Sequence, residues 1–139
     1  MKIKLHHLNL CSNNVEGMDE FYRNILDFEP EPSLEAGRTK DGGYDARVSF
    51  LKTGKTQFHL ATKDLEIAFK KNQAINPLEK GHIAFRTDDI NGFKKRLDEN
   101  GISYSDYGDW AMGGWYQIFF FDPDGNCIEV HQAGDEDLG

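Results

Sequence analysis

Four residues of this sequence have side chains and settings that suit a metal centre. His7, His59 and His82 each lie in a short β-like run, and Glu129 stands between two apolar residues near the end of the chain. A carboxylate in an apolar strand is costly to bury unless it is paired or bound to a metal. Two or three imidazoles with one carboxylate suit a divalent transition metal, whether Fe, Ni, Co, Mn, Zn or Cu.

Strands would have to carry these side chains. Residues 117–131 form two β-rich runs joined by a Pro-Asp-Gly-Asn turn, which predicts a hairpin because Pro presets φ and Gly accepts a positive φ. Side chains alternate along a strand, so Cys127, Glu129 and His131 would share one face. We expect His131 to be exposed near the end of the chain, and His6 to be packed or exposed rather than a ligand.

The two halves of the sequence repeat one order of elements, β-α-β-β-β. Periodicity and cap residues predict, in the first half, a strand at 3–10, a helix at 15–26, an extended segment at 29–32 and a hairpin of 46–51 with 57–61. They predict, in the second half, a strand at 81–86, a helix at 90–100, a short strand at 102–104, an aromatic loop at 107–115 and the final hairpin. His7 then corresponds to His82, and His59 to Glu129.

We therefore predict an α+β fold, one domain built from two tandem βαβββ modules that share a sheet. Module one covers about residues 1–63, a linker 64–79, module two 80–132, and an acidic tail 133–139. One face of the sheet would pack the helices, and the other would carry the His and Glu side chains. Periodicity predicts this facing but not the curvature of the sheet.

Composition argues against several classes of function. A formal net charge of -8 and a pI near 5.0 argue against nucleic acid or an anionic membrane surface as the main partner. The two cysteines, Cys11 and Cys127, form no spaced framework, so neither a disulfide scaffold nor a zinc ribbon is predicted. Without an apolar signal-peptide core or a run of roughly 20 apolar residues, we expect a cytoplasmic protein.

Three segments in register resemble the vicinal oxygen chelate superfamily, which includes glyoxalase I, methylmalonyl-CoA epimerase, extradiol dioxygenases and bleomycin-binding proteins. The segments are residues 7–10 leading into 21–28, residues 81–85, and residues 120–129. The resemblance implies a curved mixed sheet around a metal-binding cavity, with metal ligands at His7, His82 and Glu129 and with His59 at the fourth position. Glu or Gln usually stands at that position in the glyoxalase I and epimerase branches. Glu129 and His59 are the predicted catalytic residues, and His59 either completes the ligand set or acts as a base.

A substrate wall is predicted around this centre. Strand faces and an aromatic loop supply its candidate residues, which are Arg47, Tyr104, Trp115, Gln117 and Phe119. Packing beneath a long loop is the alternative explanation for the aromatic members. A charged, Gly-rich loop at residues 36–45 could reach an anionic substrate, although a solvated loop is the simpler reading.

Three functions remain open at this point. The first is a metal-dependent, glyoxalase-like lyase or isomerase that stabilises an enolate-type intermediate of a small oxygen-bearing substrate. The second is an extradiol-type dioxygenase, for which two His and one carboxylate around Fe(II) are the recurring set. The third is a non-catalytic protein that binds a drug or metabolite. We expect a homodimer, and whether a site forms within one chain or between two chains stays open.

Overall fold

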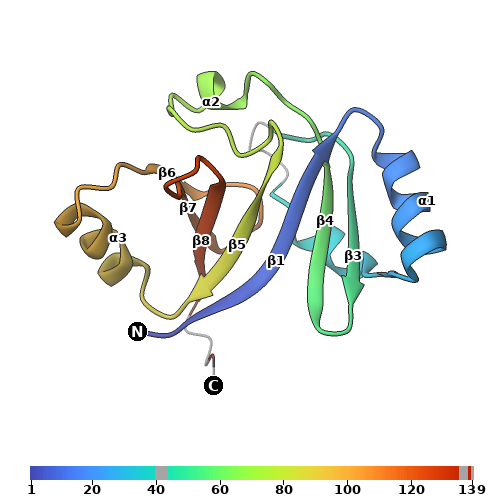
Figure 1. Ribbon diagram of the computed structural model, residues 1–139, viewed down its shortest axis with the longest axis horizontal. Helices are drawn as coiled ribbons and strands as arrows, with labels where there is room; N and C mark the ends of the chain where they lie inside the picture. The colour runs from blue at the N-terminus through green and yellow to red at the C-terminus, as the bar shows by residue number, and fades with distance from the viewer. Residues whose placement is uncertain (40–43, 135–137, 139) are drawn as a thin grey trace.

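One eight-stranded mixed sheet is the frame of the protein, seen in the computed structural model, which describes residues 1–39, 44–134 and 138 (Figure 1). The strands are β1 (Ile3–Ser12), β2 (Glu29–Pro30), β3 (Val48–Thr53), β4 (Thr56–Thr62), β5 (Gly81–Thr87), β6 (Ser105–Asp109), β7 (Trp115–Phe121) and β8 (Cys127–Ala133). Their order across the sheet is β2-β3-β4-β1-β5-β8-β7-β6. Strands β1 and β5 pair antiparallel at the centre, and each has a parallel neighbour, β4 or β8. The two halves of the chain thus meet edge to edge with equivalent strand orders.

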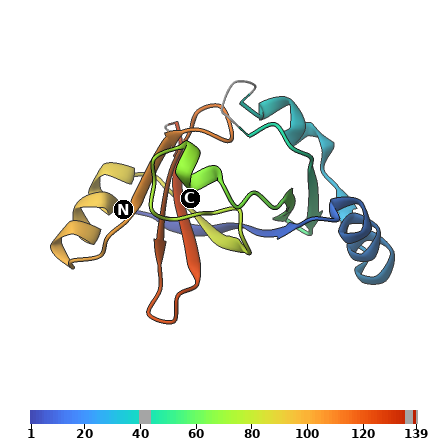
Figure 2. The same cartoon turned by 90° about the horizontal axis from the view of Figure 1, so that it is seen from above.

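Two helices, α1 (Val15–Leu26) and α3 (Ile90–Glu99), cover the outer face of this sheet. The others are α2 (Ile67–Lys70), whose Ile67 packs with Trp110 and Phe119 on the opposite side, and the 3-10 helix η1 (Pro32–Gly37). Figure 2 shows α1 and α3 outside the two arms of the curved sheet. Asn14 begins α1 by accepting a hydrogen bond from the Gly17 N–H, and Asp89 does the same for Gly92 in α3. No helix among the described residues is long and apolar enough to cross a membrane.

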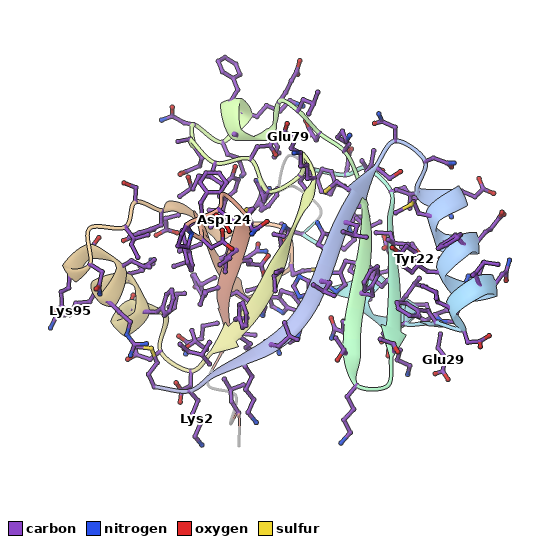
Figure 3. The ribbon with its side chains drawn as sticks, viewed as in Figure 1. Lys2, Tyr22, Glu29, Glu79, Lys95 and Asp124 are labelled. Atoms are coloured by element: carbon purple, nitrogen blue, oxygen red, sulfur yellow. The ribbon has the colours of Figure 1, made fainter. Side chains whose placement is uncertain are left out.

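Two apolar clusters attach these helices to the sheet. Tyr22 of α1 points toward the sheet, where its ring lies 4.8 Å from that of Phe58, whereas Lys95 lies on the outer side of α3 (Figure 3). The first cluster joins α1 to β3 and β4 through the buried residues Val15, Leu51, Phe58 and Leu60. The second joins α3 to β7 and β8 through Ile90, Phe93, Leu97, Ile118 and Val130. The outer sheet face therefore packs the helices, which leaves the other face for polar side chains.

The predicted α+β fold with a curved mixed sheet is confirmed, and two strand boundaries differ. The strand predicted at 102–104 begins at Ser105, because the N–H of Ile102 still bonds to the Leu97 carbonyl and completes the end of α3. The segment predicted at 107–115 as a loop contains part of β6. Of the extended segment 29–32 only Glu29–Pro30 forms a strand, since Pro32 begins η1. Residues 40–43 of the predicted loop and residues 135–137 and 139 of the predicted tail lie outside the described residues.

Candidate metal centre

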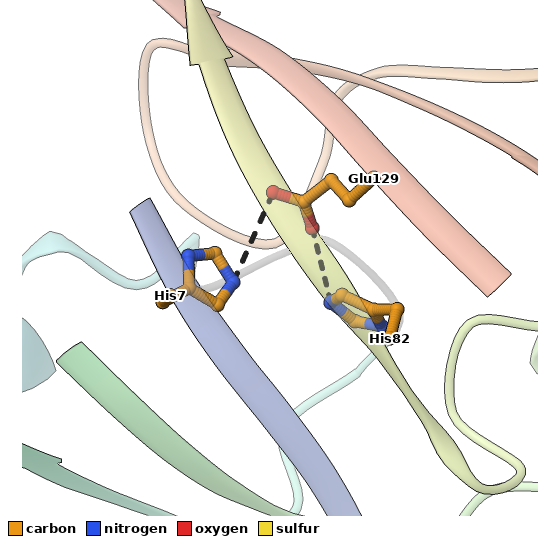
Figure 4. A group of neighbouring side chains, drawn as sticks. All are labelled: His7, His82 and Glu129. Atoms are coloured by element: carbon orange, nitrogen blue, oxygen red, sulfur yellow. Dashed lines mark ion pairs between the residues drawn. The ribbon is translucent and has the colours of Figure 1, made fainter. Parts of the chain in front are cut away.

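Two histidines and a glutamate converge on the inner face of the sheet. His7 extends from β1, His82 from β5 and Glu129 from β8, and their ligand atoms all lie within 4.8 Å of one another (Figure 4). The distances are 3.9 Å from His7 Nε2 to Glu129 Oε2, and 3.1 Å from His82 Nε2 to Glu129 Oε1. All three residues belong to one chain. Their convergence needs only strands of this chain.

Strand register explains why these side chains meet. Ala84 of β5 pairs with His7 on one side and with Glu129 on the other, so the three residues form a row across the sheet. Paired residues share a face, and His82 precedes Ala84 by two positions, so it shares that face too. Ala84 is fully buried and ends at its Cβ. Its small side chain leaves space above the sheet for the imidazoles and the carboxylate to approach one another.

The hydrogen bonds of His82 fix its tautomer. His82 Nδ1 lies 3.0 Å from the Pro77 carbonyl, which can only accept, so Nδ1 carries a proton. In the neutral ring, Nε2 then presents a lone pair to the Glu129 carboxylate 3.1 Å away. Two acceptors at that distance repel unless a cation lies between them, either a proton or a metal ion. This arrangement, with the mixed imidazole and carboxylate donor set, fits a divalent transition metal.

Buried neighbours control the charge of the site. Burial lowers the pKa of His7 well below 6.5, so its ring is neutral and keeps a lone pair for a metal. Burial raises the pKa of Glu129, but the imidazoles around it, with a hydrogen bond from His131, outweigh burial and hold the Glu129 pKa well below 4.5. Gln117 adds a donor, with its Nε2 3.2 Å from Glu129 Oε1. The carboxylate is therefore ionised and held at both oxygens.

His59 lies beside this group and outside it. Its ring stacks on that of His7 with centroids 3.9 Å apart, and its Nε2 is 2.9 Å from the Gln57 side-chain oxygen. Burial lowers the pKa of His59 to about 3, so the ring is neutral at pH 7. The predicted fourth position thus lines the same cavity, but its nitrogen is not among the ligand atoms that meet at Glu129.

The remaining two histidines also lie at the centre, so all five in the chain gather there. The expectation that His131 is exposed is wrong: β8 continues to Ala133 between β5 and β7, and His131 is fully buried with Nδ1 2.6 Å from Glu129 Oε2. Its shared parity with Glu129 was the available signal. His6 lies with its Nδ1 2.8 Å from His7 Nδ1, because a β-bulge between Leu5 and His7 turns both histidines inward.

A cavity opens over the three ligand residues. Two short segments, residues 37–39 and 111–113, pair beside it: the Thr39 N–H donates to the Ala111 carbonyl at 3.0 Å, and the Gly113 N–H to the Gly37 carbonyl at 2.9 Å. Arg38, Ala111 and Met112 of these segments line the cavity. The cavity therefore has walls from both halves of the chain.

The predicted wall residues divide into two groups. Trp115, Gln117 and Phe119 line the cavity. Arg47 does not, because Val48 and Phe50 of the same strand segment face inward and the alternation turns Arg47 outward, where it lies 3.8 Å from Glu16. Tyr104 packs instead against the α3 cluster. Arg38, which belongs to the charged loop predicted at residues 36–45, lines the cavity while its guanidinium bonds to Glu35 and to the Ala46 carbonyl.

Comparisons with known proteins agree with this architecture. "Glyoxylase I 4" of Arabidopsis thaliana is 28% identical over 130 residues, which cover 91% of this chain and 68% of that protein. The methylmalonyl-CoA epimerase of Mycobacterium tuberculosis has a TM-score of 0.64 at 16% identity, with 94% of this chain and 88% of the other covered. A variant of the Streptomyces coelicolor methylmalonyl-CoA epimerase, in complex with 2-nitronate-propionyl-CoA, has a TM-score of 0.68 at 19% identity and covers 98% of each chain. Identities this low show a shared fold alone.

The family assignment comes from the sequence match. The family model of the Glyoxalase/Bleomycin resistance protein/Dioxygenase superfamily matches residues 4–130, which include all three candidate ligands and His59. The chain therefore belongs to the Glyoxalase/Bleomycin resistance protein/Dioxygenase superfamily.

Proposed function

We propose that this protein is a metal-dependent, glyoxalase-like enzyme of the lyase or isomerase type, acting on a small oxygen-bearing substrate. The observation that carries the proposal is the convergence of His7, His82 and Glu129 beneath one cavity. Three protein ligands leave coordination positions open, as is usual for catalytic rather than structural metal sites. Membership of a superfamily that includes glyoxalases and dioxygenases supports an enzyme further.

The residues of the chain divide the work of such a reaction. His7, His82 and Glu129 would hold the ion, and a bound divalent metal would supply Lewis-acid stabilisation of negative charge on a substrate oxygen. Trp115 and Phe119 supply apolar walls that exclude water and hold the body of the substrate. Histidines aside, the described lining of the cavity contains two ionisable residues that carry a charge, Glu129 and Arg38. Both are hydrogen-bonded to protein partners.

His59 is the proposed base. Its neutral ring can accept a proton from a substrate held in the cavity, and its stack on His7 places it directly beside the ligand group. Because burial lowers its pKa to about 3, His59 is a weaker base than a free imidazole. It therefore suits a substrate whose carbon-bound proton has been acidified by charge stabilisation on the neighbouring oxygen.

Metal analysis followed by proton exchange tests the proposal. Protein purified without added metal or an affinity tag should hold close to one transition metal per chain, and the His82→Ala and Glu129→Ala variants should lose it. Metal-loaded protein in deuterated water should then exchange or isomerise the hemithioacetal of glutathione and methylglyoxal, with loss of that activity in His59→Gln. A wild-type protein that cannot be loaded with Fe, Ni, Co, Mn, Zn or Cu would overturn the proposal and favour the non-catalytic binding protein.

A second candidate is an extradiol-type dioxygenase, favoured by one specific observation. The ligand set is two histidines and one carboxylate with His59 outside it, which is the arrangement used by non-haem Fe(II) oxygenases. Oxygen consumption by the Fe(II)-loaded protein with catechols would establish this function, and its absence together with proton exchange would leave the lyase or isomerase. The homodimer and the cytoplasmic location stay predictions, and size-exclusion chromatography with light scattering tests the first.

A further inference from the structure

His131 is tied to a partner at each of its two ring nitrogens. Arg86 Nε lies 2.9 Å from His131 Nε2, and His131 Nδ1 lies 2.6 Å from Glu129 Oε2. A guanidinium N–H only donates, so Nε2 must accept. The ring proton must therefore lie on Nδ1, where it is donated to the carboxylate. Arg86 and Glu129 thus both favour the tautomer of His131 in which Nδ1 carries the proton.

Strand pairing and ring stacking hold this arrangement in place. His131 of β8 pairs with Arg86 on β5 and with Gln117 on β7, so all three side chains stand side by side on the inner face. The Trp115 indole lies parallel to the His131 ring, with centroids 4.5 Å and planes 6° apart. Arg86 Cζ also lies 4.7 Å from the centre of the Trp115 ring. The imidazole therefore cannot rotate without breaking a stack and two hydrogen bonds.

We propose that Arg86 and His131 form a positioning pair that orients Glu129 for metal binding. The pair acts on the oxygen Oε2, while Gln117 holds Oε1, so neither oxygen is free to swing away from the cavity. Without Arg86 the carboxylate still favours the Nδ1–H form, but the His131 ring is held by one hydrogen bond instead of two and orients Glu129 less firmly. Arg86 thus acts on Glu129 through His131. The inference rests on the metal centre of the proposed function, but not on the reaction.

The tautomer can be measured in metal-free protein. Two-bond ¹H–¹⁵N correlation spectra of the histidine side chains should assign the Nδ1–H form to His131 in the wild type, and in Arg86→Met the His131 Nε2 signal should shift because this nitrogen loses its donor. The matched control is Arg23→Met, which removes an arginine of α1 that pairs with Asp19 on the surface, and should leave the His131 signals unchanged. An Nε2–H tautomer in the wild type would overturn the inference, whether or not the protein binds metal.

Metal affinity tests the coupling between the two residues. Loss of a partner that orients a metal ligand weakens metal binding by about 10–100-fold, which is the change expected for the Zn(II) dissociation constant of His131→Phe. The Phe ring preserves the stack on Trp115. Arg86→Met alone should also weaken Zn(II) binding, but in the His131→Phe background it should produce no further change, since its route to Glu129 is gone.

Two outcomes of this comparison between the single and double variants of Arg86 and His131 would contradict the proposal. Equal effects of Arg86→Met with and without His131, or wild-type affinity in His131→Phe, would contradict the positioning pair. Thermal unfolding of each metal-free variant shows whether it is folded. If His131→Phe does not fold, His131→Asn replaces it, because the Asn amide N–H can take the place of the Nδ1 donor while no Asn atom takes the place of the Nε2 acceptor. His131→Asn should then keep near wild-type affinity and be insensitive to Arg86→Met. If His131 has the Nδ1–H tautomer but the protein binds no Zn(II), that result contradicts the proposed function alone.

Discussion

His59 stacks face to face on His7, with ring centroids 3.9 Å and planes 19° apart. The two residues lie on the parallel neighbours β4 and β1, two pairs apart in register, since His7 pairs with Gln57 and His59 with Asn9. In such a stack the in-plane nitrogens of the two rings are directed past one another rather than toward one point. His59 Nε2 is moreover bonded to Gln57. The stack thus separates the three ligands from a neighbouring group that is available for chemistry.

The first prediction is that His59 is dispensable for the metal. His59→Ala should retain close to one metal per chain, whereas His7→Ala, His82→Ala and Glu129→Ala should each lose it, because only the latter three supply converging ligand atoms. Elemental analysis of the four purified variants provides the measurement. A metal-free His59→Ala variant that is still folded by circular dichroism would make His59 the fourth ligand instead.

Ala84 provides a second prediction, because it lies in the row between His7 and Glu129. Ala84→Leu adds three carbons where the ligand side chains converge, and overpacking of a buried site costs about 1–3 kcal/mol. If the penalty falls on the metal-bound form, Zn(II) binding should weaken by about 5–150-fold, as measured by competition with a chromophoric chelator.

The control for this substitution is on the same strand. Ile83 faces the other side of the sheet and is partly exposed, so Ile83→Leu should leave the Zn(II) dissociation constant unchanged. If Ala84→Leu kept the wild-type affinity for Zn(II), the ligands would not need the space above this residue.

How much the sequence could predict depends on whether a feature is local. Alternation along β8 correctly placed Glu129 opposite its apolar neighbours, and the cap residues Asn14 and Asp89 correctly marked where α1 and α3 begin. These features need only the neighbouring residues. The same local reasoning assigned Arg47 to the wall of the cavity, but alternation along its strand segment points Arg47 to the opposite face.

Features that depend on distant segments were not predictable in this way. No Gly or Pro in the sequence marks the bulge that turns both His6 and His7 inward. The bulge appears only when β1 is paired with β5. The bridge between Arg38 and Met112 joins the two halves across the cavity, and it depends on the curvature of the sheet. Periodicity determines the face on which a side chain lies, whereas curvature arises from twist accumulated over all the strands.

A third prediction concerns stability rather than chemistry. The Asp89 side chain accepts the Gly92 N–H at 2.9 Å and caps α3. Asp89→Ala should lower the free energy of unfolding by about 1 kcal/mol, measured by urea denaturation of metal-free protein, while Asp89→Asn keeps an accepting oxygen and should cost less. Zn(II) affinity should not change in either variant. Equal destabilisation by Asn and Ala would attribute the effect to the charge of Asp89 rather than to its hydrogen bond.

The buried thiol of Cys11 leads to a prediction about alkaline pH. Burial raises the pKa of Cys11 from 9.0 to about 11, so the folded chain keeps this proton where the unfolded chain loses it. The resulting stabilisation is complete below pH 9.0 and is lost as the pH rises toward about 11. Two pKa units correspond to about 100-fold less thiolate at pH 8, so Cys11 should react with a disulfide reagent at least that much more slowly in native than in urea-unfolded protein. In a series of urea denaturations between pH 8 and pH 10.5, Cys11→Ala should lose less stability than the wild type. Parallel losses in the two proteins would assign the alkaline effect to other groups.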